Sequence, residues 1–250
     1  MSNYLATADI GHWVIRTGET PGGIPSTVAV DPAIIANNPN AVDYYFDSTA
    51  EATDLWNDTF GPYPFDSTGA IEDARYNGQP LGFSLETQTR PIYSGFRSTS
   101  TIAHEQAHQW YGDSVSVRTW DSIWLNEGFA SFAQYLWLDH LGTRTAHESF
   151  LLDYSRKKND PFWDTVIADP QRDTMFANAV YRRGAMTLQA LREKIGDDPF
   201  FQILRTWAAQ HRYGTATTEH FTALSEQISG QDLDSFFQTW LYSSGKPTSW

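Results

Sequence analysis

The arrangement of hydrophobic and polar residues predicts a chain that begins with strands and turns. Short apolar runs at residues 12–16 and 27–30, separated by the turn-forming sequence Thr-Pro-Gly-Gly-Ile-Pro, are typical of strands. Apolar side chains then recur at helical spacing over residues 41–60, with Asn40 as the expected N-cap. Beyond Gly-Pro-Tyr-Pro, three further strands are expected, at residues 69–75, 81–88 and 91–93.

Helical patterns predominate in the second half of the chain. Helices are expected at residues 145–158, 175–195, 199–213, 218–228 and 233–242. Three glycines, Gly196, Gly214 and Gly230, stand where C-caps are expected, and Asp198 and Thr217 are the expected N-caps. The predicted fold class is α+β and predominantly α, with a small sheet-bearing lobe followed by a helical lobe.

The sequence His-Glu-Gln-Ala-His lies within another helical pattern, which has no Pro or Gly until Gly112. Side chains four residues apart share one face of a helix, so His104 and His108 can bind one metal ion. Glu105 is rotated by about 100° from His104 and can act on a metal-bound water without being a ligand. A catalytic zinc ion has three protein ligands and one open position. Glu127, in a second helical pattern and separated from His108 by eighteen residues, is the expected third ligand.

Composition narrows the possible classes of protein. The chain has 250 residues, enough for one large domain or two lobes, and a net charge of −13. The negative charge argues against nucleic acid or an anionic membrane as the main partner. With 0 cysteines, disulfides and thiolate-bound zinc are excluded. No apolar run is long enough for a transmembrane helix, and no signal peptide is expected from the first residues.

These motifs resemble the aminopeptidase N family of gluzincin metallopeptidases, whose catalytic domain is thermolysin-like. The match consists of His-Glu-x-x-His followed after eighteen residues by the Glu of Asn-Glu-Gly-Phe-Ala, with Trp110 and Gly112 also as in the family. A second family motif, Val-Tyr-x-x-Gly, occupies residues 180–184. The resemblance extends from about Tyr44 to the C-terminal residues. It implies a zinc-dependent aminopeptidase with one Zn²⁺ per chain, acting on the N-terminal peptide bonds of peptides.

The resemblance also implies roles for individual residues. Glu105 would be the general base that takes a proton from the attacking water, and Tyr181 would stabilise the oxyanion. The family sequence Gly-Ala-Met-Glu-Asn, whose Glu binds the α-amine of the substrate, corresponds here to Phe-Ser-Leu-Glu-Thr at residues 83–87. Glu86 is therefore the expected substrate-binding residue, although the Gly and Asn of the family sequence are absent.

The family organisation sets expectations for the domains. Residues 1–40 are expected to be remnant strands and a connection from an N-terminal β domain, which would be the absent partner of this chain. Residues 41–250 would form the catalytic domain, with a sheet-bearing lobe (41–141) that includes the metal-binding helices and a helical lobe (142–250). Two alternatives stay open: a gluzincin endopeptidase without amine anchoring, and a truncated zinc-binding domain that is inactive without its N-terminal domain.

Overall fold

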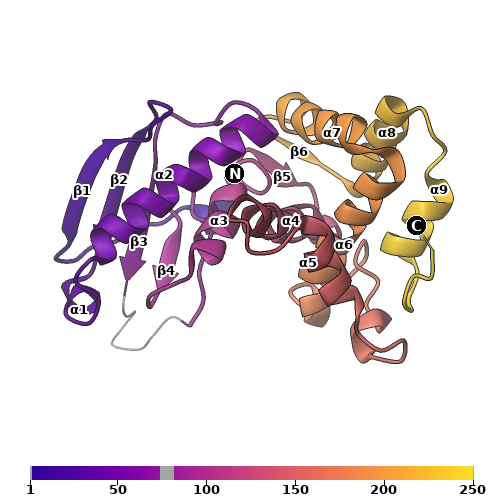
Figure 1. Cartoon of the computed structure of the whole chain (residues 1–250), viewed down its shortest axis with the longest axis horizontal. Coiled ribbons are helices and arrows are strands. Elements are labelled where there is room, and N and C mark those ends of the chain that lie inside the picture. The colour runs from indigo at the N-terminus through magenta and orange to yellow at the C-terminus, as the bar shows by residue number, and fades with distance from the viewer. Residues whose placement is uncertain (1, 74–81, 250) are drawn as a thin grey trace. The chain divides into compact units, whose positions relative to one another are not determined.

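The computed structural model describes residues 2–73 and 82–249. The chain divides into two compact units, Met1–Ser114 and Val115–Trp250 (Figure 1), and each is described by itself. The lobes expected on either side of residue 141 stay a prediction. The elements themselves are a small sheet and many helices, which confirms the predicted α+β, predominantly α fold class.

Unit 1 is built on a four-stranded sheet in the order β1-β2-β3-β4. Its elements are η1 (Asn3–Leu5), β1 (Val14–Glu19), β2 (Pro25–Val30), α1 (Pro32–Ile35), α2 (Ala41–Phe60), β3 (Thr68–Asp73), β4 (Ile92–Ser94) and α3 (Thr99–Ala107). β1 and β2 are antiparallel, whereas β3 is parallel to β2 and β4. Parallel neighbours need a long crossover, and α2 supplies it between β2 and β3 (Figure 1). The predicted bounds of this helix are confirmed.

One glycine is required for the pairing of β2 with β3. Gly69 lies opposite Thr27, and a Cβ atom at Gly69 would lie 1.9 Å from the carbonyl oxygen of Thr27. Any larger residue would push the strands apart at the point where β3 enters the sheet. Gly69 therefore allows the close approach of the two backbones.

The strand expected at residues 81–88 was wrong over the part that the structure describes. Residues 82–88 form only one isolated bridge, between Leu85 and Ile92. The chain then turns at Thr89, which has a φ of 66°, and the Thr87 hydroxyl donates to the Arg90 carbonyl at 2.5 Å. This turn connects the two bridged residues, and residues 82–84 before it form no strand. The last two residues of the strand expected at 69–75, and residue 81, lie outside the described residues.

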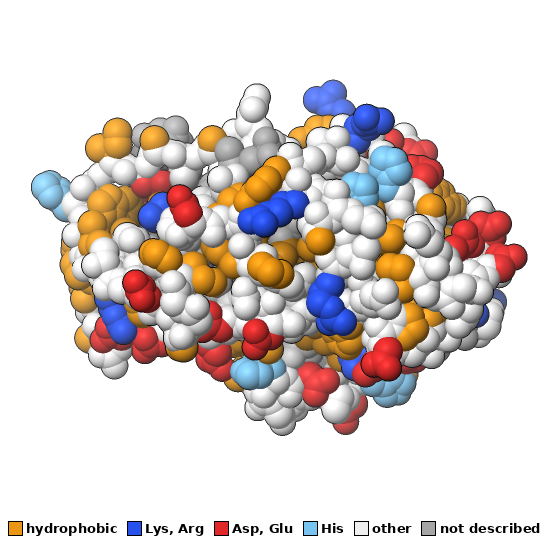
Figure 2. Space-filling model, turned by 90° about the horizontal axis from the view of Figure 1, so that it is seen from above, with side chains coloured by type: hydrophobic (Ala, Val, Ile, Leu, Met, Phe, Trp, Pro, Cys, Tyr) orange, Lys and Arg blue, Asp and Glu red, His pale blue; other side chains and the backbone are white. Residues whose placement is uncertain are grey.

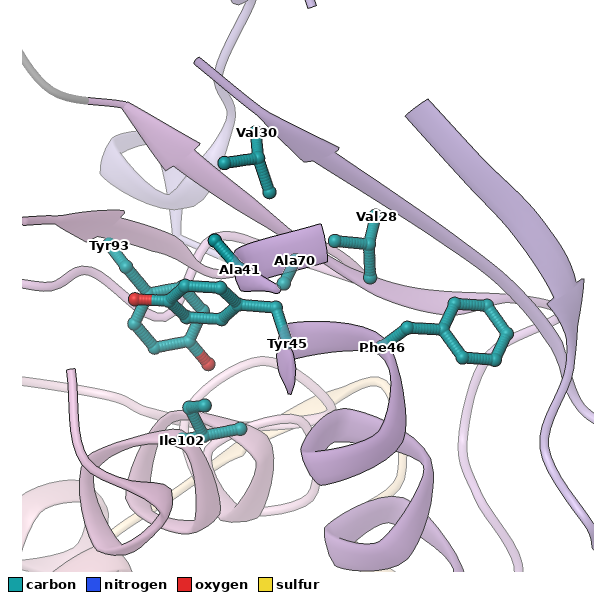
Figure 3. Packing of buried hydrophobic residues seen from close by; sticks show 8 residues of the cluster. All are labelled: Val28, Val30, Ala41, Tyr45, Phe46, Ala70, Tyr93 and Ile102. Atoms are coloured by element: carbon teal, nitrogen blue, oxygen red, sulfur yellow. The ribbon is translucent and has the colours of Figure 1, made fainter. Parts of the chain in front are cut away.

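A hydrophobic cluster joins α2 and α3 to the sheet (Figure 3). Its members are Val28, Val30, Ala41, Tyr45, Phe46, Ala70, Tyr93 and Ile102, none of them more than 6% exposed. The Tyr45 ring, from α2, packs on the Tyr93 ring of β4 with centroids 5.2 Å apart. Each fully buried large side chain contributes about 1.5–3 kcal/mol. Through Ile102, this cluster fixes α3, the helix of the His-Glu-x-x-His motif.

Unit 2 is mainly helical, with one two-stranded parallel sheet. Its elements are β5 (Val115–Val117), η2 (Trp120–Ser122), α4 (Trp124–His140), α5 (Ala146–Tyr154), η3 (Pro161–Asp164), η4 (Arg172–Thr174), α6 (Asn178–Ile195), α7 (Asp197–Gln210), β6 (Gly214–Ala216), α8 (Thr218–Ser229), α9 (Asp234–Phe237) and η5 (Gln238–Tyr242). Helices α4 and α6 touch through two glycines. A Cβ atom on Gly184 would lie 2.6 Å from the Cα of Gly128.

Some helix ends differ from the sequence prediction. Gly196 and Gly230 end α6 and α8 with φ values of 87° and 68°, as expected. Gly214 does not cap a helix, because it pairs with Val115 as the first residue of β6. Asp198 is not an N-cap either, since α7 already begins at Asp197.

The surface of the protein carries charges of both signs. On the face shown in Figure 2, acidic and basic side chains are interspersed. Within residues 2–73 and 82–249, no helix has the length and hydrophobicity that crossing a membrane requires.

Candidate metal centre

Helix α3 is held in unit 1 by buried polar contacts. The Gln106 side chain accepts a hydrogen bond from the Thr68 hydroxyl at 3.1 Å and donates to the Gly69 carbonyl at 3.0 Å. The indole of Trp56 donates to the Ala103 carbonyl at 2.9 Å. Because all these groups are buried, breaking any one bond would leave a costly unsatisfied partner. The position of α3 is thus fixed directly before the histidine motif, at Ala103, and within it, at Gln106.

The two histidines of the motif converge. The Nε2 atoms of His104 and His108 lie 3.2 Å apart, with the rings at 82° to each other. Two nitrogen ligands of one tetrahedral zinc ion, bound at about 2.0–2.1 Å, would lie about 3.3 Å apart. The Nδ1–H of His108 donates to the Tyr111 carbonyl at 3.0 Å. That bond orients the ring and leaves Nε2 as the metal-binding nitrogen, so the imidazole pair fits zinc.

Two carboxylates gather beside His108. One ligand atom from each of Glu86, Glu105 and His108 lies within 4.8 Å of the other two, and all three residues are buried. Burial first, and then the charge of Glu86, raises the pKa of Asp113 well above its usual range, while His108 opposes this shift. Carboxylates held together away from water repel one another. The cluster therefore favours the binding of a cation.

Glu127 and Tyr181 lie on two touching helices of unit 2. Glu127 is in the first turn of α4 and is 5% exposed, whereas Tyr181 is in the first turn of α6 and half-buried. The N-terminal end of a helix interacts favourably with a negative charge, so a carboxylate is suited to the position of Glu127 in the first turn of α4. His104 and His108 belong to unit 1, so ligation of one metal by all three residues stays a prediction.

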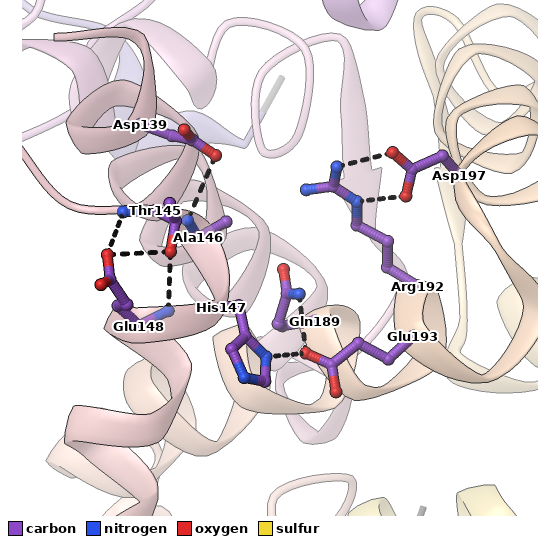
Figure 4. Close-up of polar contacts among 9 residues, drawn as sticks. All are labelled: Asp139, Thr145, Ala146, His147, Glu148, Gln189, Arg192, Glu193 and Asp197. Carbon is purple, nitrogen blue, oxygen red and sulfur yellow. Dashed lines mark hydrogen bonds and ion pairs between the residues drawn. The ribbon is translucent and has the colours of Figure 1, made fainter. Parts of the chain in front are cut away.

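A second cluster of charged groups lines a cavity of about 290 Å³ in unit 2 (Figure 4). His147 pairs with Glu193 at 2.7 Å, and Gln189 donates to the same carboxylate at 2.9 Å. Arg192 holds Asp197 through two bonds of 2.8 Å. The ion pair of His147 with Glu193 connects α5 to α6, and that of Arg192 with Asp197 connects α6 to α7. We therefore interpret this cluster as one that stabilises the fold.

Sequence reasoning missed two contacts of the candidate centre. One is the Tyr111 carbonyl, which only the turn after α3 brings to His108. The other is the phenol of Tyr4, which donates to Glu86 Oε1 at 3.2 Å across 82 residues of sequence. Neither contact has a sequence motif, and the second depends on long-range folding.

Comparison with known proteins decides the family. The model of the peptidase family M1 domain matches residues 69–240. This range includes the six residues predicted for the site, which are Glu86, His104, Glu105, His108, Glu127 and Tyr181. The chain belongs to peptidase family M1. This finding confirms the resemblance stated from the His-Glu-x-x-His and Val-Tyr-x-x-Gly motifs.

The relatives of this M1 chain are longer proteins. Aminopeptidase N of Lactococcus lactis subsp. cremoris is 27% identical over 269 residues, covering 99% of this chain and 31% of that protein. Glutamyl aminopeptidase of Bos taurus is 26% identical, with coverages of 99% and 28%. This chain thus spans less than a third of the length of these two relatives.

A solved structure has the same fold. The M1 zinc metallopeptidase from Deinococcus radiodurans superimposes with a TM-score of 0.81 and 25% sequence identity, covering 95% of this chain and 52% of that one. This agreement with a zinc metallopeptidase fits the expected zinc cofactor and metallopeptidase class.

Proposed function

We propose that this chain is the catalytic domain of a zinc-dependent aminopeptidase that hydrolyses the N-terminal peptide bond of peptides. The observation that carries the proposal is the 3.2 Å separation of the His104 and His108 Nε2 atoms, within a chain of peptidase family M1. Relatives named as aminopeptidases, from a bacterium and a mammal, support an exopeptidase.

The metal would be held by His104, His108 and Glu127. Support for the third ligand comes from its spacing in the motif and from its burial at the beginning of α4. Zinc bound there would supply Lewis acidity, lowering the pKa of a water molecule and polarising the scissile carbonyl. The rest of the reaction belongs to side chains of the protein.

Proton transfer is assigned to Glu105. Glu105 is buried, with one carboxylate oxygen within 4.8 Å of a ring nitrogen of His108, and it is not one of the three proposed ligands. A carboxylate in that place takes a proton from the attacking water and returns it to the leaving amine. Tyr181 is assigned to the oxyanion, because a phenol donates a hydrogen bond that strengthens as negative charge develops on the carbonyl oxygen.

Amine recognition is assigned to Glu86. Its carboxylate is buried near Glu105. The α-ammonium group of a peptide substrate is a cation that can form an ion pair with this carboxylate. An ammonium bound at Glu86 places the first peptide bond, and no later one, near the metal-binding nitrogens. A protein without this anchor would cut internal bonds, which is the endopeptidase alternative.

The test is turnover of matched substrates by the zinc-loaded chain. We expect cleavage of aminoacyl-coumarin substrates and no cleavage of their N-acetyl counterparts or of internally quenched peptides blocked at the N-terminus. The Glu105→Gln variant, with its zinc retained, serves as the background control. Cleavage of blocked peptides would favour the endopeptidase. One bound zinc without any turnover would favour the truncated, inactive domain.

A further inference from the structure

The segment η1 is held against the part of the chain that carries Glu86. The Tyr4 phenol donates to Glu86 Oε1 at 3.2 Å, and the Leu5 carbonyl accepts from the Gln88 amide at 3.2 Å. Leu5 is 1% exposed, so its side chain is buried. Two residues of η1 thus contact the two neighbours of Thr87. Tyr4 binds Glu86 through its side chain, and Leu5 binds Gln88 through the backbone.

We propose that Tyr4 is a positioning residue for Glu86, and that it holds the carboxylate in the orientation in which Oε2 receives the α-ammonium group of the peptide. The inference rests on the proposed function, since it assigns Tyr4 to the amine-recognition step. In this role Tyr4 acts on the substrate through Glu86.

Glu86 needs such a partner because of its surroundings. Oxygen atoms of Glu86 and Glu105 and a nitrogen of His108 lie within 4.8 Å of one another in a buried place. Two carboxylates in this arrangement repel each other, and a glutamate side chain can rotate away. A hydrogen bond donated to one oxygen opposes that rotation and stabilises the negative charge.

A tyrosine is suited to this task because its phenol is a neutral donor. A lysine or an arginine in the same place would pair with the carboxylate and compete with the ammonium group of the substrate. The phenol instead occupies one oxygen and leaves the charge of the carboxylate in place. Glu86 therefore keeps its attraction for a cation.

The Tyr4 hydroxyl is not what holds η1 in place. Burial of Leu5 and the bond from the Gln88 amide already fix the segment. The Tyr4→Phe variant is therefore expected to fold with its ring in the same position. What it loses is one donor to Glu86.

The experiment compares Tyr4→Phe with the wild-type chain, both loaded with zinc. The expected result is a KM for aminoacyl-coumarin substrates raised about 10-fold, with kcat within about twofold, because a hydrogen bond to a charged group has this magnitude. Tyr63→Phe is the matched control, since it removes another phenol bond of unit 1, the one to the Ser67 carbonyl at 3.1 Å. Zinc content and melting temperature are measured for each variant.

A second measurement keeps the inference separate from the proposed function. Binding of the dipeptide Leu-Ala and of N-acetyl-Leu-Ala is measured by calorimetry with zinc-loaded Glu105→Gln protein, with and without Tyr4→Phe. Weaker binding of the free dipeptide alone, by about 10-fold, supports the role of Tyr4 even where no turnover is found. An unchanged KM and Kd, or equal losses in Tyr63→Phe or on the acetylated dipeptide, would overturn it.

Discussion

The Nε2 atom of His104, in the last turn of α3, lies 3.2 Å from the Nε2 atom of His108, the residue that caps this helix. This is close to the separation of two ligands on one tetrahedral zinc ion. The Tyr111 carbonyl fixes one of the two rings through its Nδ1–H. The pair is thus arranged for a metal by the backbone of unit 1.

The first prediction concerns metal content. We expect one zinc ion per chain, and less than a tenth of that in the His108→Gln variant after gel filtration, because an amide oxygen is a much weaker zinc ligand than imidazole. Metal analysis by mass spectrometry measures the content. His12→Gln, at an exposed position of unit 1, is the control and should keep its zinc. Full zinc in His108→Gln would remove that residue from the ligand set.

The second prediction tests whether Glu127 completes the site. The zinc affinity of the Glu127→Ala variant should be lower than that of the wild type by a factor of about 100 or more. Mutating a residue that only hydrogen-bonds to a metal ligand already lowers metal affinity about 10–100-fold, and the loss of a ligand should cost more. Competition with a fluorescent chelator measures the affinity. A zinc affinity equal to that of the wild type would show that Glu127 is not a ligand.

The third prediction concerns Tyr181. If its phenol donates to the oxyanion, Tyr181→Phe should lower kcat about 100- to 1,000-fold, with little change in KM. This decrease corresponds to a loss of about 2.7–4 kcal/mol of transition-state stabilisation. Steady-state kinetics on an aminoacyl-coumarin substrate separate the two constants. Near-normal turnover would leave Tyr181 a packing residue of α6.

The fourth prediction concerns the stability of unit 2. Arg183 is 0% exposed and donates to five carbonyl groups, those of Trp163, Thr165, Thr239, Trp240 and Ser243. Burial lowers its pKa to about 10, which leaves it charged at neutral pH. Arg183→Met would remove the guanidinium donor from these carbonyl groups, and we expect a loss of about 3–5 kcal/mol in the free energy of unfolding.

The neighbouring arginine provides the control for this experiment. Arg182 is partly exposed and approaches Asp153 only at 3.8 Å. Arg182→Met should therefore change the free energy of unfolding by less than about 1 kcal/mol in urea denaturation. Similar losses in the two variants would contradict the special role of Arg183.

The fifth prediction is a dependence of stability on pH. Burial first, and then the charges of Asp31 and Asp73, raises the pKa of Glu72 from 4.5 to about 7, with Arg97 opposing the shift. Between these two values the folded chain binds more protons than the unfolded chain, so this contribution to stability is lost as the pH rises.

The substitution Glu72→Gln removes the titration. It should raise the free energy of unfolding at pH 8 by about 1–3 kcal/mol and change it little at pH 4.5. Denaturation at the two pH values, with the exposed Glu19→Gln as control, measures the effect. An equal effect of Glu72→Gln at both pH values would contradict the raised pKa.

Local patterns predicted the parts of the structure that depend on neighbours in sequence. Helix α2 follows from its periodicity, and the meeting of His104 with His108 follows from four-residue spacing on one helix. The strand expected at 81–88 failed because a strand needs a partner along its length, and the described residues form one bridge. Gly214 was predicted to end a helix because local sequence patterns do not show its pairing with Val115, which lies 99 residues earlier in the chain.

The contact of Gly128 with Gly184 limits which amino acids the fold tolerates at these two positions. A methyl group on either glycine would lie 2.6–2.8 Å from the Cα of the other, so even alanine would force the two helices apart. Gly128 follows Glu127 directly, and Gly184 lies one turn beyond Tyr181. Neither position can gain a side chain by a single mutation without moving a candidate functional residue. We therefore expect that random mutagenesis followed by selection for activity will recover many changes at Arg182 and none at these two glycines.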